Sequence, residues 1–149
     1  MNGPEAVKNS LIFLLLAAAA WTDISKMRIP NWLIGIGCIL RIPLFLMEWK
    51  IAGKEAFIQG EEKLAGSILL LLGFAVFAAV SQYGLGFGDV KLLGVMALYQ
   101  GVEETLICLL YGLLPAAVFC LILLAAGRIH RKDKLPLAPF FLLGYLLVH

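Results

Sequence analysis

The chain has 149 residues, of which 62% are hydrophobic and only 15% are charged, and its mean hydropathy is +0.95. An ordinary soluble domain is roughly 45–50% apolar and about 25% charged, so this composition excludes a soluble globular protein and indicates an integral membrane protein. The formal net charge of +2 excludes little, because the distribution of charge along the chain matters more than its sum. The three cysteines lie in apolar stretches without a C-x-x-C pair, which argues against a zinc site and a disulfide framework.

Six apolar stretches follow one another along the chain, and each is a candidate membrane helix. They cover residues 7–22, 32–49, 64–83, 90–100, 106–127 and 135–148. A helix needs about 20 apolar residues to cross the hydrocarbon core, so the fourth and sixth stretches are short. None of them alternates as the strands of a membrane barrel do. We therefore predict an all-α fold, a polytopic bundle of about six transmembrane helices that forms one domain over residues 1–149.

The first stretch ends in Trp21-Thr22-Asp23 without a small-residue cleavage site, so we expect a retained helix rather than a removed signal peptide. The Lys and Arg residues of the short loops predict the orientation. With the N-terminus outside, seven of them fall in inner loops and four in outer segments, and residues 128–134 give the strongest signal. We predict that both termini lie outside and that Asp23 and Asp89 lie at the same inner membrane face.

Asp89 directly follows a glycine-rich turn, Gly86-Phe87-Gly88, and precedes an apolar stretch. Glycine permits a sharp turn and close backbone approach, which would bring Asp89 to a helix start. A carboxylate at the edge of the bilayer is costly to keep ionised, so a membrane acid is a functional candidate. The alternative is a loop with an ordinary helix-capping aspartate. Two such acids could share a proton and activate water.

Asp23 is followed by Arg28-Ile29-Pro30-Asn31, in which Pro30 fits a turn or a helix start. Arg28 could bind lipid phosphate or hold the loop inside. Arg41 falls within the second stretch, where a charge needs a partner. We expect it to snorkel, or to bind carbonyl groups and an acid such as Glu48, rather than to contact a substrate.

Three motifs resemble one known family. Gly86-Phe87-Gly88-Asp89-Val90-Lys91 is similar to the G-x-G-D signature of membrane aspartyl proteases. Asp23 followed by R-I-P-N narrows the resemblance to the type IV prepilin peptidases and their archaeal preflagellin relatives. The pair Pro136 and Pro139, in Pro136-Leu137-Ala138-Pro139-Phe140, is similar to that family as well.

The resemblance implies a catalytic pair, Asp23 and Asp89, with Gly86, Gly88, Lys91, Arg28, Pro30, Asn31, Pro136 and Pro139 as supporting motif residues. It also implies the substrate, a pilin-like precursor whose short basic leader is cut at the cytoplasmic face of a bacterial or archaeal membrane. Only seven residues separate Asp23 from Asn31, and paired cysteines are missing, so we expect no N-methyltransferase insert. Neither a cofactor nor a nucleic-acid partner is expected, and the oligomeric state is left open.

Other functions stay open at this point. Paired membrane acids also mark ion pathways, so a small proton-coupled transporter or channel is the main alternative, although no internal repeat supports it. A non-catalytic subunit of a pilus machine is a third. A metal between the two acids is disfavoured because two carboxylates are too few ligands for a tight site. Ser25 and Lys26 are a poor Ser–Lys pair, since adjacent residues on a helix point apart.

Overall fold

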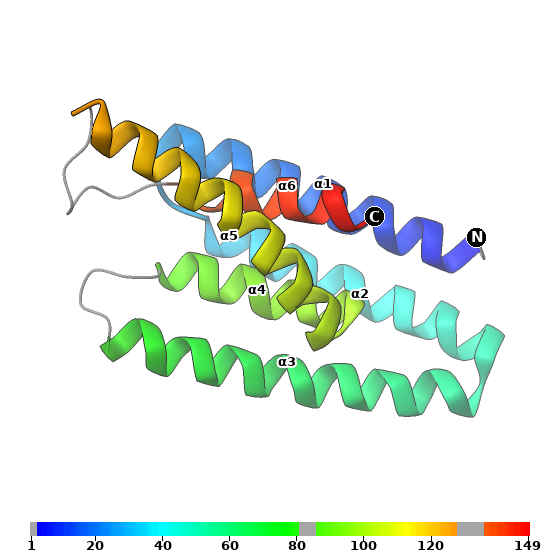
Figure 1. The fold of residues 1–149 in the computed structure, drawn as a ribbon. Coiled ribbons are helices and arrows are strands. Elements are labelled where there is room, and N and C mark those ends of the chain that lie inside the picture. The colour runs from blue at the N-terminus through cyan, green and yellow to red at the C-terminus, as the bar shows by residue number, and fades with distance from the viewer. Residues whose placement is uncertain (1–2, 81–85, 128–135) are drawn as a thin grey trace.

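The computed structural model describes residues 3–80, 86–127 and 136–149. Over these residues the chain is all-helical and contains no strand, which confirms the predicted fold class. The six helices, shown in Figure 1, are α1 (Gly3–Lys26), α2 (Asn31–Ala52), α3 (Lys54–Val80), α4 (Phe87–Gln100), α5 (Val102–Ala125) and α6 (Ala138–Val148).

Four helices, α1, α2, α3 and α5, are long and apolar enough to cross a membrane. The other two, α4 with 14 residues and α6 with 11, rise only about 1.5 Å per residue and are too short to cross about 30 Å of hydrocarbon. The third predicted stretch began at residue 64, but α3 begins ten residues earlier, because the polar segment before Leu64 is helical too. Residues 128–134, which carry the strongest orientation signal, lie outside the described residues.

The short helix α4 forms the centre of the bundle. It runs back along α3 and also contacts α1, α2 and α5. Every residue of α4 from Leu92 to Ala97 is buried, and Tyr99, the largest fully buried side chain among the described residues, follows two positions later. Gly101, with a φ of +103°, ends α4 and allows α5 to begin at the next residue. In Figure 1 the start of α4 is set back from the ends of α3 and α5.

The other short helix, α6, packs between α1 and α5. Its approach to α5 requires glycine on both sides. A Cβ at Gly112 would collide with the backbone of Phe140, and a Cβ at Gly144 would collide with the carbonyl oxygen of Cys108. Small residues of this kind let two membrane helices bring their backbones close together. The beginning of α6 is thereby fixed against α5 and α1.

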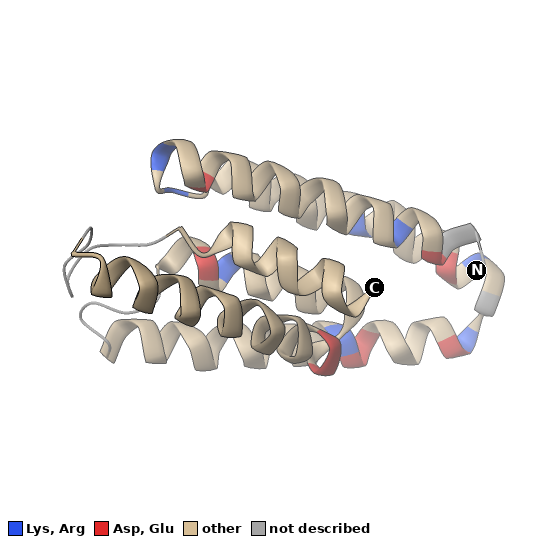
Figure 2. Cartoon of the chain, turned by 45° about the horizontal axis from the view of Figure 1, so that its top comes forward, with Lys and Arg blue, Asp and Glu red and all other residues tan. Residues whose placement is uncertain are grey.

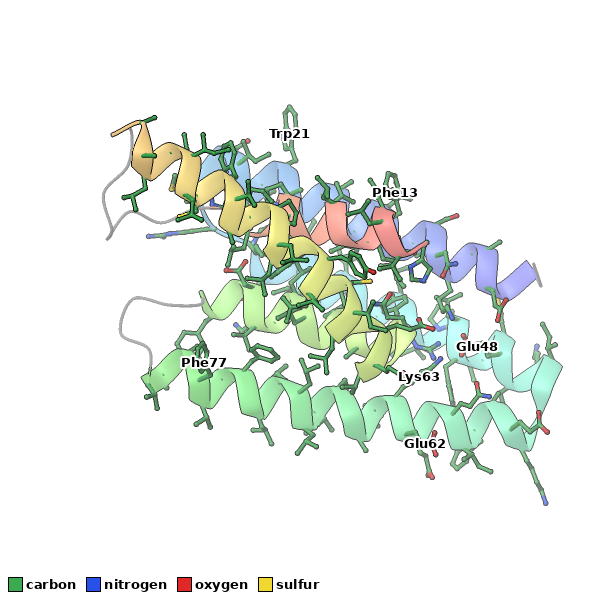
Figure 3. All side chains as sticks on the ribbon, in the orientation of Figure 1. Phe13, Trp21, Glu48, Glu62, Lys63 and Phe77 are labelled. Atoms are coloured by element: carbon green, nitrogen blue, oxygen red, sulfur yellow. The ribbon has the colours of Figure 1, made fainter. Side chains whose placement is uncertain are left out.

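The outer surface of the middle of the bundle is apolar (Figure 2). Exposed side chains include Leu69 and Val76 on α3 and Leu121 on α5, as expected of helices that face lipid. Figure 2 shows that the described charged residues fall into two zones separated by an uncharged middle section. Figure 3 shows Phe13 and Trp21 pointing away from the bundle, and Trp21 is 75% exposed. This arrangement fits a multi-pass membrane protein, with a tryptophan at a membrane interface.

Candidate active site

Asp89 lies in the first turn of α4, outside the four helices that are long enough to cross a membrane. It is the third residue of the helix, and its side chain accepts a hydrogen bond from the backbone N–H of Gly86, the N-cap. In the capping box, the side chain of the third helical residue accepts a hydrogen bond from the N-cap backbone N–H in the same way. A Cβ at Gly86 would lie only 3.0 Å from Asp89 Oδ2, so a larger residue would crowd the carboxylate.

The environment of Asp89 favours its protonated form. Burial, and after it the negative charge of Asp23, raise the pKa of Asp89 from 3.8 to about 6, although the Gly86 hydrogen bond acts in the opposite direction. The charge of Asp23 therefore acts on the Asp89 carboxyl group.

Asp23 lies one turn before the end of α1 and is buried, with 7% of its surface exposed. The helix ends after it because Met27 adopts a φ of +48°, and the backbone N–H of Met27 donates to the carbonyl oxygen of Asp23 at 2.8 Å. The carboxylate itself accepts a hydrogen bond from the backbone N–H of Ala138, with 3.1 Å between nitrogen and Oδ2. The Asp23 carboxylate is therefore held by Ala138, a residue of α6 that lies 115 positions later in the chain.

Both aspartates line one cavity of about 250 Å³. Its remaining walls come from the α1–α2 connection and the start of α4, namely Met27, Arg28, Ile29, Gly86, Phe87 and Gly88. The cavity is large enough to hold several water molecules, which occupy about 30 Å³ each in the liquid. Two carboxyl groups that line one cavity can serve as an acid and a base toward a molecule bound there.

The Arg28-Ile29-Pro30-Asn31 motif, which leads into α2, supports this cavity. Pro30 is the N-cap of α2, in an extended conformation with φ −71° and ψ 136°, and Asn31 is its first residue. The ammonium group of Lys91 donates to Asn31 Oδ1 at 3.0 Å, which joins α4 to α2. A Cβ at Gly88 would lie 3.2 Å from the Cβ of Ile29, so only glycine lets this connection lie so close to α4.

The motif that contains Pro136 and Pro139 supports Asp23 through the start of α6. Ala138 is the first residue of α6, and Pro139 occupies its second position, where proline is well tolerated. Pro136 lies just before the helix. The three sequence motifs therefore meet at one end of the bundle: Asp89 with Gly86, Gly88 and Lys91, Asp23 with residues 28–31, and the beginning of α6.

Some residues of the site had no signal in the sequence. Met27 and Phe87 line the cavity, but an exposed methionine or phenylalanine beside an apolar stretch is unremarkable. The contribution of Ala138 is a backbone N–H, which is independent of residue type. In the sequence, this segment is marked only by the neighbouring prolines, Pro136 and Pro139.

Arg41 lies away from this site, near the far end of α4. Its Nε donates to the carbonyl oxygen of Leu98 at 3.0 Å, and its Nη2 is 2.9 Å from Glu48 Oε2. The predicted pairing with Glu48 is confirmed, whereas the carbonyl group belongs to α4 rather than to the proline-containing helix α2. A cation at the C-terminal end of a helix is favourable for the helix dipole. Arg41 is therefore a structural link between α2 and α4.

No group of three or more His, Cys, Asp or Glu side chains in the described parts of the chain could hold a metal ion.

The fold and the cavity together define a helical membrane protein with paired aspartates at one end of its bundle. Residues 10–121 match the type IV leader peptidase family, so the chain belongs to this family. The chain is also similar to the prepilin leader peptidase/N-methyltransferase of Bacillus subtilis (strain 168), with 29% identity over 141 residues. That alignment covers 94% of this chain but 54% of the relative, so the chain spans about half the length of the relative. No solved structure gives a significant match.

Proposed function

We propose that this protein is a membrane aspartyl endopeptidase that removes the short basic leader from type IV pilin-like precursors. The single observation that carries the proposal is that Asp23 and Asp89, from two separate motifs, line one cavity at one end of the bundle. Membership of the type IV leader peptidase family supports the peptidase reaction, and the name of the Bacillus subtilis relative supports a prepilin-like substrate.

The two carboxyl groups supply the acid and the base of the reaction. The ionised carboxylate takes a proton from a water in the cavity, and the water oxygen attacks the carbon of the scissile carbonyl group. The protonated carboxyl donates a hydrogen bond to the carbonyl oxygen as negative charge develops on it. When the tetrahedral intermediate collapses, the C–N bond breaks, and one of the two carboxyl groups, both protonated at this stage, gives its proton to the leaving amine. A pair that carries one proton in total can complete this cycle and return to its starting state.

The position of the cavity supports a cut at the membrane surface. The start of α4 is set back from the ends of α3 and α5 (Figure 1). Arg28, which lines the cavity, and Lys26, at the end of α1, are both exposed. The mature part of a pilin-like substrate begins with an apolar helix that lies in the bilayer, so the junction to be cut lies where lipid meets water. We propose that this face is cytoplasmic and that both termini are outside, on the strength of the Lys and Arg distribution.

We further propose that the chain does not methylate the new N-terminus. The connection between α1 and α2 contains only residues 27–30, which leaves no insert between the two halves of the Asp23 motif. Incubation of a cleaved, apolar-headed peptide with a methyl donor should therefore give an unmodified mass.

Cleavage of a synthetic precursor tests the proposal. The purified full chain, in detergent micelles, is mixed with a peptide that carries a basic leader, a glycine and an apolar segment, and the products are identified by mass spectrometry. Asp23→Asn and Asp89→Asn should each lower the cleavage rate by at least about 10²-fold, since each removes one acid–base group. A suitable control is Glu62→Gln, because Glu62 lies on α3 and points away from the bundle (Figure 3). Cleavage by Asp89→Asn at the unmodified rate would refute the assignment.

A further inference from the structure

The first amide groups of α6 divide their hydrogen bonds between the helix itself and Asp23. Phe140 and Phe141 both donate their backbone N–H to the carbonyl oxygen of Leu137, at 3.0 and 3.1 Å. Pro139 has no N–H to donate. The N–H of Ala138 points out of the helix start, where the backbone of the helix itself offers no acceptor. Asp23 Oδ2 is its acceptor, at 3.1 Å.

This hydrogen bond lies in a buried setting. Ala138 is completely buried, and Asp23 is 7% exposed. The close contacts of Gly112 and Gly144 fix α6 against α5, and α6 also packs on α1, which carries Asp23. The donor and the acceptor are therefore held by separate helices whose relative position is fixed by packing.

The charged groups around Asp23 are few. Asp89 of α4 and Arg28 of the α1–α2 connection line the same cavity, and Lys91 of α4 is bonded to Asn31. Residues 138–143 of α6 and residues 31–34 of α2 contain no charged side chain. Among the described residues, the Ala138 N–H is therefore the polar contact that α6 makes to the Asp23 carboxylate.

We propose that the backbone N–H of Ala138 is a positioning group for the reaction, which fixes the Asp23 carboxylate through Oδ2 and leaves Oδ1 available to the attacking water. The inference rests on the proposed function and adds a role for the proline-containing segment at the start of α6. Pro136 and Pro139 flank this start, and because Pro139 has no N–H, Ala138 supplies the amide of the first two helical positions that can bind Asp23. A carboxylate that could rotate would present either oxygen, and a misplacement of about 1 Å can cost about 10²-fold in rate.

An amide-to-ester replacement tests this role without changing any side chain. Ala138→lactic acid, introduced by nonsense suppression during cell-free synthesis of the full chain, replaces the N–H by an oxygen atom. Because the bond positions a reacting group and does not bind the substrate, kcat for the precursor peptide should fall by about 10- to 100-fold while KM stays within about twofold. A purely structural bond would lower the thermal stability and leave kcat of the folded protein unchanged, and that result would overturn the proposal.

The matched control is the equivalent ester at Phe140, in the same helical turn. It removes the hydrogen bond to Leu137 O, which belongs to α6 itself, and does not touch Asp23. Its kcat should stay within about twofold of that of the unmodified protein. An equal loss of kcat in both esters would show that α6 only needs to be intact, and would overturn the specific role of Ala138.

Amide hydrogen exchange tests the bond independently of catalysis. In Asp23→Ala, the amide of Ala138 should exchange at least about 10-fold faster than in the unmodified protein, because its acceptor is gone, while the amide of Phe140 should not change. Unaltered exchange at Ala138 would overturn the inference even if the protein were inactive on the precursor peptide. Failure of the unmodified protein to cleave would instead count against the proposed function.

Discussion

Lys91 of α4 donates a hydrogen bond to the side chain of Asn31, the first residue of α2, across 3.0 Å. The two residues are 60 positions apart, and each belongs to a different sequence motif. The bond ties the helix that carries Asp89 to the connection that follows Asp23. It therefore helps to keep the two halves of the cavity in register, although neither residue lines the cavity.

The first prediction concerns this link. Lys91→Met and Asn31→Ala should each lower the cleavage rate several-fold. In the double variant the losses should not add, since the two single changes break the same bond. The coupling energy from thermal unfolding should be about 0.5–1 kcal/mol, because the bond is exposed to solvent. Strictly additive losses in both measurements would show that the bond contributes nothing.

The second prediction concerns Gly88. Gly88→Ala should lower both stability and cleavage, because the new Cβ would lie 3.2 Å from Ile29 Cβ and push the α1–α2 connection away from Asp89. Overpacking of this kind costs about 1–3 kcal/mol. Gly35→Ala is the control, since Gly35 is also helical and a Cβ there meets nothing within 4 Å. It should be neutral or stabilising by up to about 1 kcal/mol in thermal unfolding. Equal effects of the two substitutions would contradict this view of the contact.

The third prediction is a pH dependence of stability that arises from Asp89. Burial and the charge of Asp23 raise the pKa of Asp89 to about 6 in the folded protein, against an ordinary value of 3.8. Between these values the folded state binds the proton more tightly than the unfolded chain. The stability that this proton provides is therefore lost as the pH rises toward about 6. The unfolding midpoint in detergent should fall over this range, and Asp89→Asn should remove that part of the slope. An identical slope in the variant would show that Asp89 is not the group responsible.

The fourth prediction concerns the buried cation at the other end of α4. Glu48→Ala should destabilise the protein more than Arg41→Met. The first change leaves the guanidinium of Arg41 buried without its carboxylate partner, although it keeps the hydrogen bond to Leu98 O and the contact with the Tyr99 ring, whereas the second leaves a carboxylate that is partly exposed. Thermal unfolding of the two variants gives the comparison. A larger loss in Arg41→Met would mean that the hydrogen bond to α4, rather than the uncompensated charge, dominates.

Much of this protein could be predicted from local patterns in the sequence. Apolar stretches bounded by charges predicted six helices, because a backbone in lipid must satisfy its hydrogen bonds within the segment. The glycines before Asp89 predicted that this residue begins a helix, since that signal depends only on neighbouring residues. The pairing of Arg41 with Glu48 could be expected for the same reason, as the two lie two turns apart on one helix.

The tertiary structure decided which segments meet. The hydrogen bond from Lys91 to Asn31 and the one from Ala138 to Asp23 join residues 60 or more positions apart. The central position of the short helix α4 depends on its packing against α1, α2, α3 and α5. An apolar pattern shows that a helix face will be covered but does not identify the helix that covers it. The donor at Ala138 could not be found from residue type at all, because every residue except proline carries the same backbone N–H.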